Sequence, residues 1–147
     1  MAQVTAYTNE GRYKCLEDLP IDSVELSLGY CGWERCYPGH RFGPNKRTYY
    51  VLHIVANGKG KLEKNGEVFH LTTGDAFLLC PEEEAWYEAD KKEPWTYAWI
   101  GLCGYKVKKV MQYAGFSKEK SVRSLKCTAL LKSYVDEILE VHRLRSE

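Results

Sequence analysis

The sequence predicts one mainly β domain that ends in two α-helices. Residues 22–103 contain short apolar segments separated by turn signals, which is typical of an antiparallel sandwich or barrel. Beyond Gly104 the spacing of apolar residues changes to that of helices. The chain has 147 residues, 44% hydrophobic and 28% charged, and no low-complexity linker, so we expect a single core.

The first strands are indicated by alternation and by turn residues. Residues 24–28 alternate between apolar and polar, and a Gly/Pro-rich connection is expected over residues 29–45. Residues 48–55 are rich in β-branched and aromatic side chains and predict a buried central strand. Residues 59–64 and 67–71 flank Asn65-Gly66, which predicts a tight β-hairpin.

The later strands carry the aromatic residues. Residues 76–80 form an apolar strand that Pro81 ends, and the acidic residues 82–84 that follow are expected to be a solvated loop. A short strand at 86–88 precedes a longer one at 95–102. In this last strand Trp95, Tyr97 and Trp99 share one face, because side chains alternate along a strand.

Two helical segments complete the chain. In the first, one stripe holds Val107, Val110, Met111 and Ala114, and Gly115 stands at the position of a C-terminal cap. The second spans residues 128–145, with an apolar face of Leu131, Tyr134, Val135, Ile138 and Val141. This face predicts packing, either on the domain's own sheet as a lid or against a second subunit.

Charge and composition exclude several classes of protein. The formal net charge is +1, so this chain has no bulk positive field for nucleic acid. No apolar run approaches the roughly 20 residues of a membrane span, and no signal peptide begins the chain. We therefore expect a cytoplasmic protein whose six cysteines are reduced thiols.

The histidine pattern argues against metal catalysis. His40, His53, His70 and His142 are scattered, and no His-x-His pair is present to hold a metal with an open coordination position. No Gly-x-Ser-x-Gly nucleophile motif occurs either. The sequence predicts a binding module with no catalytic residue, metal or cofactor. The alternative is a stand-alone enzyme, an isomerase or oxygenase.

Several motifs together resemble the N-terminal cupin domain of AraC-family transcription regulators, most closely the branch that controls oligosaccharide-utilisation operons. They are Gly58-Lys59-Gly60, the Asn65-Gly66 hairpin, Leu71-x-x-Gly74-Asp75-x-Phe77-Leu78-Leu79-x-Pro81 and Pro94-Trp95-x-Tyr97-x-Trp99-Ile100. The resemblance implies a cupin (jelly-roll) β-barrel over 1–104 and a helical dimerisation extension over 105–147. It also implies that DNA is bound only by a helix-turn-helix domain absent from this chain.

The resemblance further implies a sugar pocket inside the barrel. Its positions correspond to Tyr87, Tyr97 and Trp99, with an arginine chosen from Arg35, Arg41 and Arg47. We favour Arg47 because it enters a strand. Physical reasoning supports such a pocket, since a sugar needs an aromatic platform and several polar groups. The alternative is that the aromatic stripe is ordinary core packing.

His53 and the last helix complete the predicted sites. His53 shares strand parity with Val51 and Val55, so it is either a ligand contact or a hydrogen-bonded core histidine. The predicted dimer contacts are Leu131, Tyr134, Val135 and Ile138. Three hypotheses follow: an allosteric sugar sensor that forms a homodimer, a small cupin enzyme, or a dimerisation module with a closed barrel.

Overall fold

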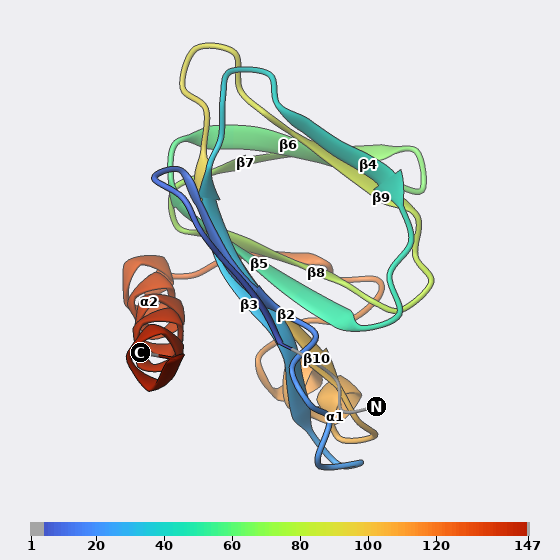
Figure 1. Cartoon of the computed structure of the whole chain (residues 1–147). Helices are drawn as coiled ribbons and strands as arrows, with labels where there is room; N and C mark the ends of the chain where they lie inside the picture. The colour runs from blue at the N-terminus through green and yellow to red at the C-terminus, as the bar shows by residue number, and fades with distance from the viewer. Residues whose placement is uncertain (1–4, 147) are drawn as a thin grey trace.

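The computed structural model describes residues 5–146, which form two facing antiparallel β-sheets with helices on the outer face of the larger sheet (Figure 1). In spatial order the larger sheet holds β1 (Ala6–Asn9), β2 (Tyr13–Glu17), β3 (Ser27–Arg35), β10 (Thr96–Cys103), β5 (Tyr50–Asn57), β8 (Asp75–Leu79) and β11 (Val122–Ser124). The smaller sheet holds β4 (Arg41–Asn45), β9 (Ala85–Ala89), β6 (Lys59–Lys64) and β7 (Glu67–Thr72).

The chain passes between the two sheets repeatedly from β3 to β10, as it does in a jelly roll. The predicted fold class, a mainly β cupin fold followed by two helices, is confirmed. The described strands nevertheless form two separate sheets rather than one closed ring of hydrogen bonds. The predicted hairpin is present between β6 and β7, where Asn65 and Gly66 both adopt positive φ angles.

Two predictions for the N-terminal part were wrong. Residues 24–28 are not the first strand, because β3 starts only at Ser27 and Val24 is 79% exposed. The expected loop over 29–45 instead contains most of β3 and all of β4. Gly32 lies inside β3. A glycine is required there because a side chain would collide with the Trp99 ring and the Lys14 carbonyl. Glycine serves close packing at this position, not a turn.

Alternation along the strands of the larger sheet builds two cores. On the inner face, Val55, Phe77 and Trp95 pack with Leu62 and Leu71 of the smaller sheet. On the outer face, side chains of opposite parity pack against the helices; they are Leu16, Cys31, Leu52, Ile54, Leu78 and Ala98. The pleat thus separates a surface that faces the smaller sheet from a surface that faces the helices.

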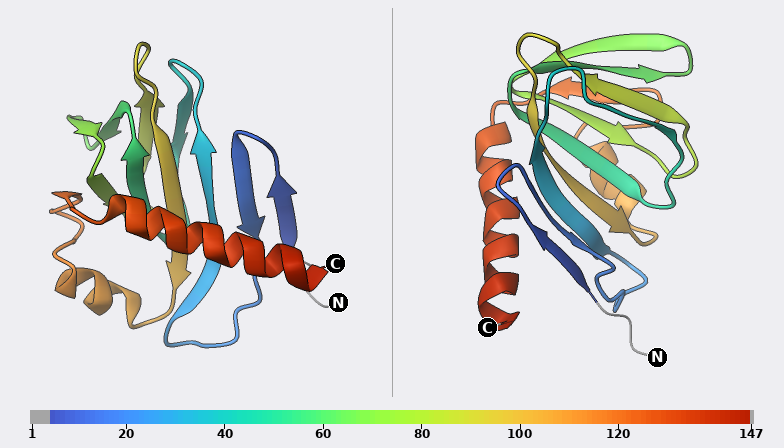
Figure 2. Two further views of the ribbon diagram at one scale, coloured as in Figure 1. Left: turned by 90° about the vertical axis from the view of Figure 1, so that its left-hand side faces the viewer. Right: turned by 45° about the horizontal axis from the view of Figure 1, so that its top comes forward.

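Both helices pack on that outer face, and Figure 2 shows α2 running across it. Helix α1 (Val107–Tyr113) buries Val107 and Met111, whereas Val110 and Ala114 are exposed, so its apolar stripe is narrower than predicted. Gly115 follows with φ of 87°, as expected of a residue that ends a helix.

Helix α2 (Thr128–Ser146) buries Val135 and Leu139 against β2, β3 and β10 of its own chain. The helix therefore covers its own sheet, as one of the two predicted arrangements required. Neither described helix has the length and hydrophobicity needed to cross a membrane.

Candidate ligand-binding site

A cavity of about 440 Å³ lies between the two sheets. This volume falls within the range of small-molecule pockets, roughly 300–1,000 Å³. Its wall comes mainly from the larger sheet and the segment before β5. The lining residues are Tyr13, Glu17, Asp18, Gly29, Tyr30, Glu34, Phe42, Arg47, Thr48, Tyr49, Val51, His53, Tyr87, Tyr97 and Trp99.

The structure brings together all five of the predicted pocket residues. Arg47, His53, Tyr87, Tyr97 and Trp99 line this one cavity, although they come from β5, β9, β10 and the loop before β5. Strand register explains part of this, because Trp99 of β10 is directly opposite His53 of β5. Residues far apart in the sequence are thereby placed in adjacent rows.

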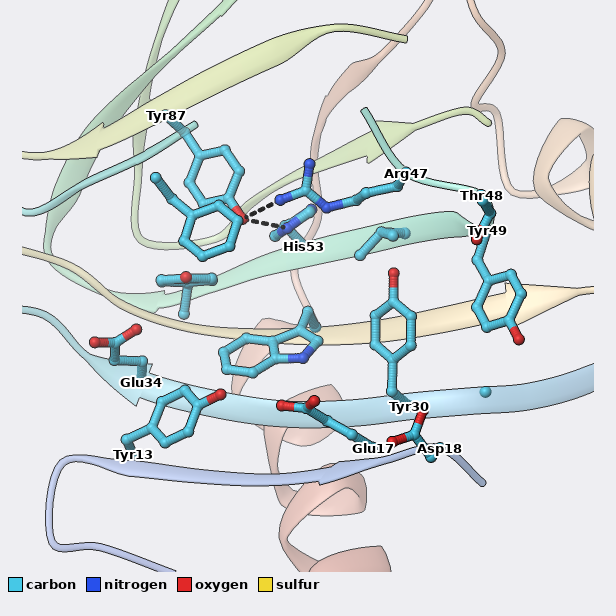
Figure 3. Close-up of a pocket in the computed structure, with 15 residues that line it drawn as sticks. Tyr13, Glu17, Asp18, Tyr30, Glu34, Arg47, Thr48, Tyr49, His53 and Tyr87 are labelled. Atoms are coloured by element: carbon cyan, nitrogen blue, oxygen red, sulfur yellow. Dashed lines mark hydrogen bonds between the residues drawn. The ribbon is translucent and has the colours of Figure 1, made fainter. Parts of the chain in front are cut away.

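Arg47 is anchored by a polar cluster in the cavity wall (Figure 3). Its Nη2 donates a hydrogen bond to the Tyr87 hydroxyl at 2.9 Å, and that hydroxyl lies 3.3 Å from Nε2 of His53. The other terminal nitrogen, Nη1, is buried and has no hydrogen-bond partner among the described residues. A buried donor without a hydrogen-bond partner is costly.

Burial keeps the groups around Arg47 uncharged. The pKa of His53 is held well below 6.5, first by burial and then by the nearby Arg47 guanidinium. Burial likewise raises the pKa of Tyr87 to about 12. At neutral pH the wall therefore presents one cation, a neutral imidazole and a protonated phenol.

The aromatic stripe of β10 divides into two parts. Tyr97 and Trp99 line the cavity, with ring centroids 5.3 Å apart, and Tyr87 meets Tyr97 edge-on at 5.8 Å. Trp95 does not reach the cavity. It is fully buried in the inner core, where Gly60 leaves room for its ring. Ordinary core packing thus accounts for Trp95, while Trp99 remains half-buried at the cavity.

The two alternative arginines lie elsewhere. Arg41 is exposed and stacks on the Trp86 ring, 3.8 Å from its centroid, and Arg35 is exposed at the end of β3. Neither lines the cavity. Arg47 does, but from the loop before β5, since that strand starts only at Tyr50. Of the three candidate arginines only Arg47 lines the cavity, and its expected position in a strand is wrong.

Sequence reasoning missed the side of the cavity that β2 and β3 form. Tyr13, Glu17 and Asp18 come from the β1–β2 hairpin, and Tyr30 and Glu34 come from β3 (Figure 3). Residues Tyr13–Glu17 do not alternate strictly between apolar and polar, because Cys15 and Leu16 are both apolar, so no period-two signal marked β2. The glycines on either side of Tyr30 were interpreted as turn signals, so the strand that contains Tyr30 was not predicted.

The acidic loop after Pro81 differs from the prediction. Glu82 and Glu84 are exposed, but Glu83 is buried, with its carboxylate 2.7 Å from the ammonium of Lys64. Within residues 5–146 no cluster of three or more His, Cys, Asp or Glu side chains is arranged to hold a metal ion.

The two facing sheets and the polar, aromatic cavity between them define a ligand-binding domain of the cupin class. The chain belongs to the family described as the AraC-like ligand binding domain, whose model matches residues 27–143. The resemblance inferred from the sequence motifs is confirmed.

Three curated relatives are operon regulators, and two of them are named for the lactose and raffinose operons. The Msm operon regulatory protein of Streptococcus mutans is 38% identical over 69% of this chain and 36% of its own length. The lactose operon transcription activator of Staphylococcus xylosus is 37% identical, over 61% of this chain and 31% of its own. The raffinose operon transcriptional regulatory protein RafR of Pediococcus pentosaceus is 36% identical, over 63% of this chain and 33% of its own length. The chain thus spans about a third of the length of these relatives.

Two solved structures are similar to this chain. YhaK from Escherichia coli superimposes with a TM-score of 0.55 at 17% identity, covering 84% of this chain and 52% of that one. A Cupin 2 conserved barrel domain protein from Salinispora arenicola gives a TM-score of 0.49 at 16% identity, covering 75% and 89%.

Proposed function

We propose that this chain is the sugar-sensing domain of a transcription regulator and that its ligand occupies the cavity beside Arg47. The observation that carries the proposal is the Arg47 guanidinium, anchored to the Tyr87 hydroxyl in a cavity that Tyr97 and Trp99 also line. The names of the curated relatives, which refer to Msm, lactose and raffinose operons, support a sugar as the ligand.

The chemistry of the cavity suits a sugar. A pyranose ring offers flat C–H faces and many hydroxyl groups, so it binds best between an aromatic surface and fixed polar groups. Trp99 supplies the aromatic surface, and the neutral His53 and Tyr87 accept or donate hydrogen bonds according to their orientation. Arg47 supplies charged N–H donors, which form stronger hydrogen bonds than neutral ones.

We propose further that residues 105–147 form a dimerisation extension. Leu130, Tyr134, Val141 and Leu144 of α2 are each at least half exposed and follow one another at intervals of four, seven and three residues, which places them along one stripe. This changes the predicted contact set. Tyr134 remains a proposed contact, and Leu131 and Ile138 lie half-buried beside the exposed stripe. Val135 is only 2% exposed and lies in the core of its own subunit, so it is no longer proposed as a contact.

DNA contact would belong to another part of a longer protein, since this chain matches about a third of each curated relative. Ligand binding and DNA binding would then be linked, because a ligand shifts a regulator only through different affinities for its two states. Analytical ultracentrifugation tests the dimer. A wild-type dimer that Val141→Asp converts to a monomer supports it, and a wild-type monomer at high micromolar concentration contradicts it.

Isothermal titration calorimetry with lactose, melibiose and raffinose tests the sensing function. Saturable heat is expected, together with a rise in unfolding temperature, because a ligand at a hundred times its Kd adds about 2.7 kcal/mol of stability. Trp99→Ala should abolish the heat while circular dichroism shows a folded protein. Folded wild-type protein that gives neither heat nor thermal shift with any sugar contradicts the proposal.

We propose that the domain binds its ligand without transforming it. A cupin isomerase or oxygenase is the alternative, and it predicts turnover. Incubating the chain with each sugar, with and without added iron or zinc, and following the sugar by NMR separates the two. An altered sugar spectrum would favour the enzyme.

A further inference from the structure

The β1–β2 hairpin precedes the segment matched by the family model, which begins at residue 27, yet it contributes Tyr13, Glu17 and Asp18 to the cavity. Figure 3 shows these three side chains on one side of the cavity and Arg47 with Tyr87 on the other. The hairpin therefore adds a second wall to the pocket. We call Tyr13, Glu17 and Asp18 the hairpin wall.

The carboxylates of the hairpin wall have no cationic partner among the described residues. No Lys, Arg or His nitrogen lies within 4.0 Å of Glu17 or Asp18, and the one hydrogen bond to Glu17 comes from the weakly donating Cys15 thiol at 3.4 Å. Each ionised carboxylate has about four lone-pair sites, so most of their acceptor capacity is open to a ligand.

Arg47 likewise has no carboxylate within 4.0 Å among residues 5–146. Opposite charges line one cavity without pairing because Glu17 ends β2 whereas Arg47 precedes β5, and β3 and β10 lie between these two strands. Three strand spacings of about 4.8 Å place the β2 and β5 backbones roughly 14 Å apart. A ligand that contacts both walls must accept hydrogen bonds from N–H groups at one end. At the other end it must donate hydrogen bonds from its own O–H groups.

We propose that the hairpin wall is a second sugar subsite, which makes the pocket selective for neutral ligands of at least two linked rings. The proposal rests on the sensing function proposed above. One ring lies on Trp99 beside Arg47, and the hydroxyl groups of the next donate hydrogen bonds to the carboxylates of Glu17 and Asp18. A single ring reaches only one wall. The cavity lining holds three carboxylates, of Glu17, Asp18 and Glu34, against one guanidinium, and this also disfavours a sugar phosphate because like charges repel.

Titration calorimetry of the whole chain with galactose, lactose, raffinose and galactose 6-phosphate tests the proposal. The test variant is Glu17→Gln with Asp18→Asn. Both side chains are exposed, and asparagine tolerates the left-handed backbone of residue 18, where φ is 57°. The matched control is Glu10→Gln, since Glu10 is exposed in the turn of the same hairpin and does not line the cavity.

The wild type should bind lactose or raffinose at least tenfold more tightly than galactose and should not bind galactose 6-phosphate. The double variant should weaken lactose and raffinose binding roughly tenfold, the effect of losing charged hydrogen bonds, and leave galactose unchanged. Glu10→Gln should alter none of these, and Arg47→Met should weaken every sugar.

Other results overturn the proposal. Two results would contradict the second subsite but leave the sensing function standing. One is equal wild-type affinity for galactose and raffinose, and the other is an equal loss of affinity for all sugars in the double variant. Tight binding of galactose 6-phosphate contradicts selection for neutral ligands. If the folded wild type binds no sugar, the sensing function fails and the subsite fails with it. Thermal unfolding of each variant establishes that it is folded.

Discussion

The buried ion pair between Lys64 and Glu83 connects three separate segments of the chain. The Lys64 ammonium lies 2.7 Å from the Glu83 carboxylate, and the two side chains are only 5% and 4% exposed. The same ammonium donates to the Lys118 carbonyl at 2.7 Å and to the Ser121 hydroxyl. Glu83 in turn accepts the backbone N–H of Cys80 at 2.8 Å. The pair therefore holds the end of β6 against the loops that precede β9 and β11.

Lys64→Met should destabilise the domain strongly. At an effective dielectric constant of 20, attraction over 2.7 Å amounts to about 6 kcal/mol before desolvation is counted. Removing one partner leaves a buried, uncompensated charge, which costs about 3–5 kcal/mol. For a domain of this size each kcal/mol lowers Tm by about 2–4 °C. We thus expect Tm to fall by roughly 6–20 °C.

Thermal and urea unfolding followed by circular dichroism measure this change. Lys59→Met is the matched control, because Lys59 pairs with Glu93 at 2.9 Å but both side chains are more than half exposed, and such pairs contribute about 0–1 kcal/mol. The double variant Lys64→Met with Glu83→Leu should recover much of the loss. A cost below about 1 kcal/mol for Lys64→Met, or one equal to that of Lys59→Met, would refute the reasoning.

Three further predictions concern packing and pH. Val135→Ala should lower the free energy of unfolding by about 1–3 kcal/mol, whereas Val141→Ala should change it by less than about 0.5 kcal/mol in monomeric protein, both by urea denaturation. Gly60→Ala should cost about 1–3 kcal/mol, because the added methyl group overlaps the buried Trp95 ring; an unchanged Tm would contradict this. The pKa of His53 is lowered, so its contribution to stability is complete above the unfolded value of about 6.5 and is lost as pH falls below it. His53→Gln should therefore flatten the loss of stability between pH 7.5 and 5.5, and an unaltered slope would argue against this origin.

Much of the fold was predictable from local patterns. The Asn65-Gly66 turn and the strands on either side of it depend on the intrinsic backbone preferences of their residues. The regular period of α2 also predicts a helix in almost any context. Residues 29–35 were mistaken for a loop, because the role of Gly32 becomes visible only when Trp99 is packed over it.

The candidate site was predicted in part, and for a specific reason. Tyr97 and Trp99 share a face because of the two-residue period, so their common orientation follows from sequence alone. Which aromatic residue reaches the cavity and which fills the core depends on neighbouring strands, and this separates Trp99 from Trp95. The hairpin wall was missed altogether, because β2 reaches the cavity only through its pairing with β3.

The sequence by itself determined the class of the protein: a mainly β domain of the AraC-like ligand-binding family, with an aromatic strand and an amphipathic final helix. The family follows from the resemblance of the sequence motifs, whereas the strands and the helix follow from composition and short-range periodicity. Only the tertiary structure decided that Val135 faces its own sheet, that Glu83 is paired inside the protein, and that Glu17 and Arg47 line one cavity from opposite sides. Each of these depends on contacts between segments distant in sequence, which no local pattern encodes.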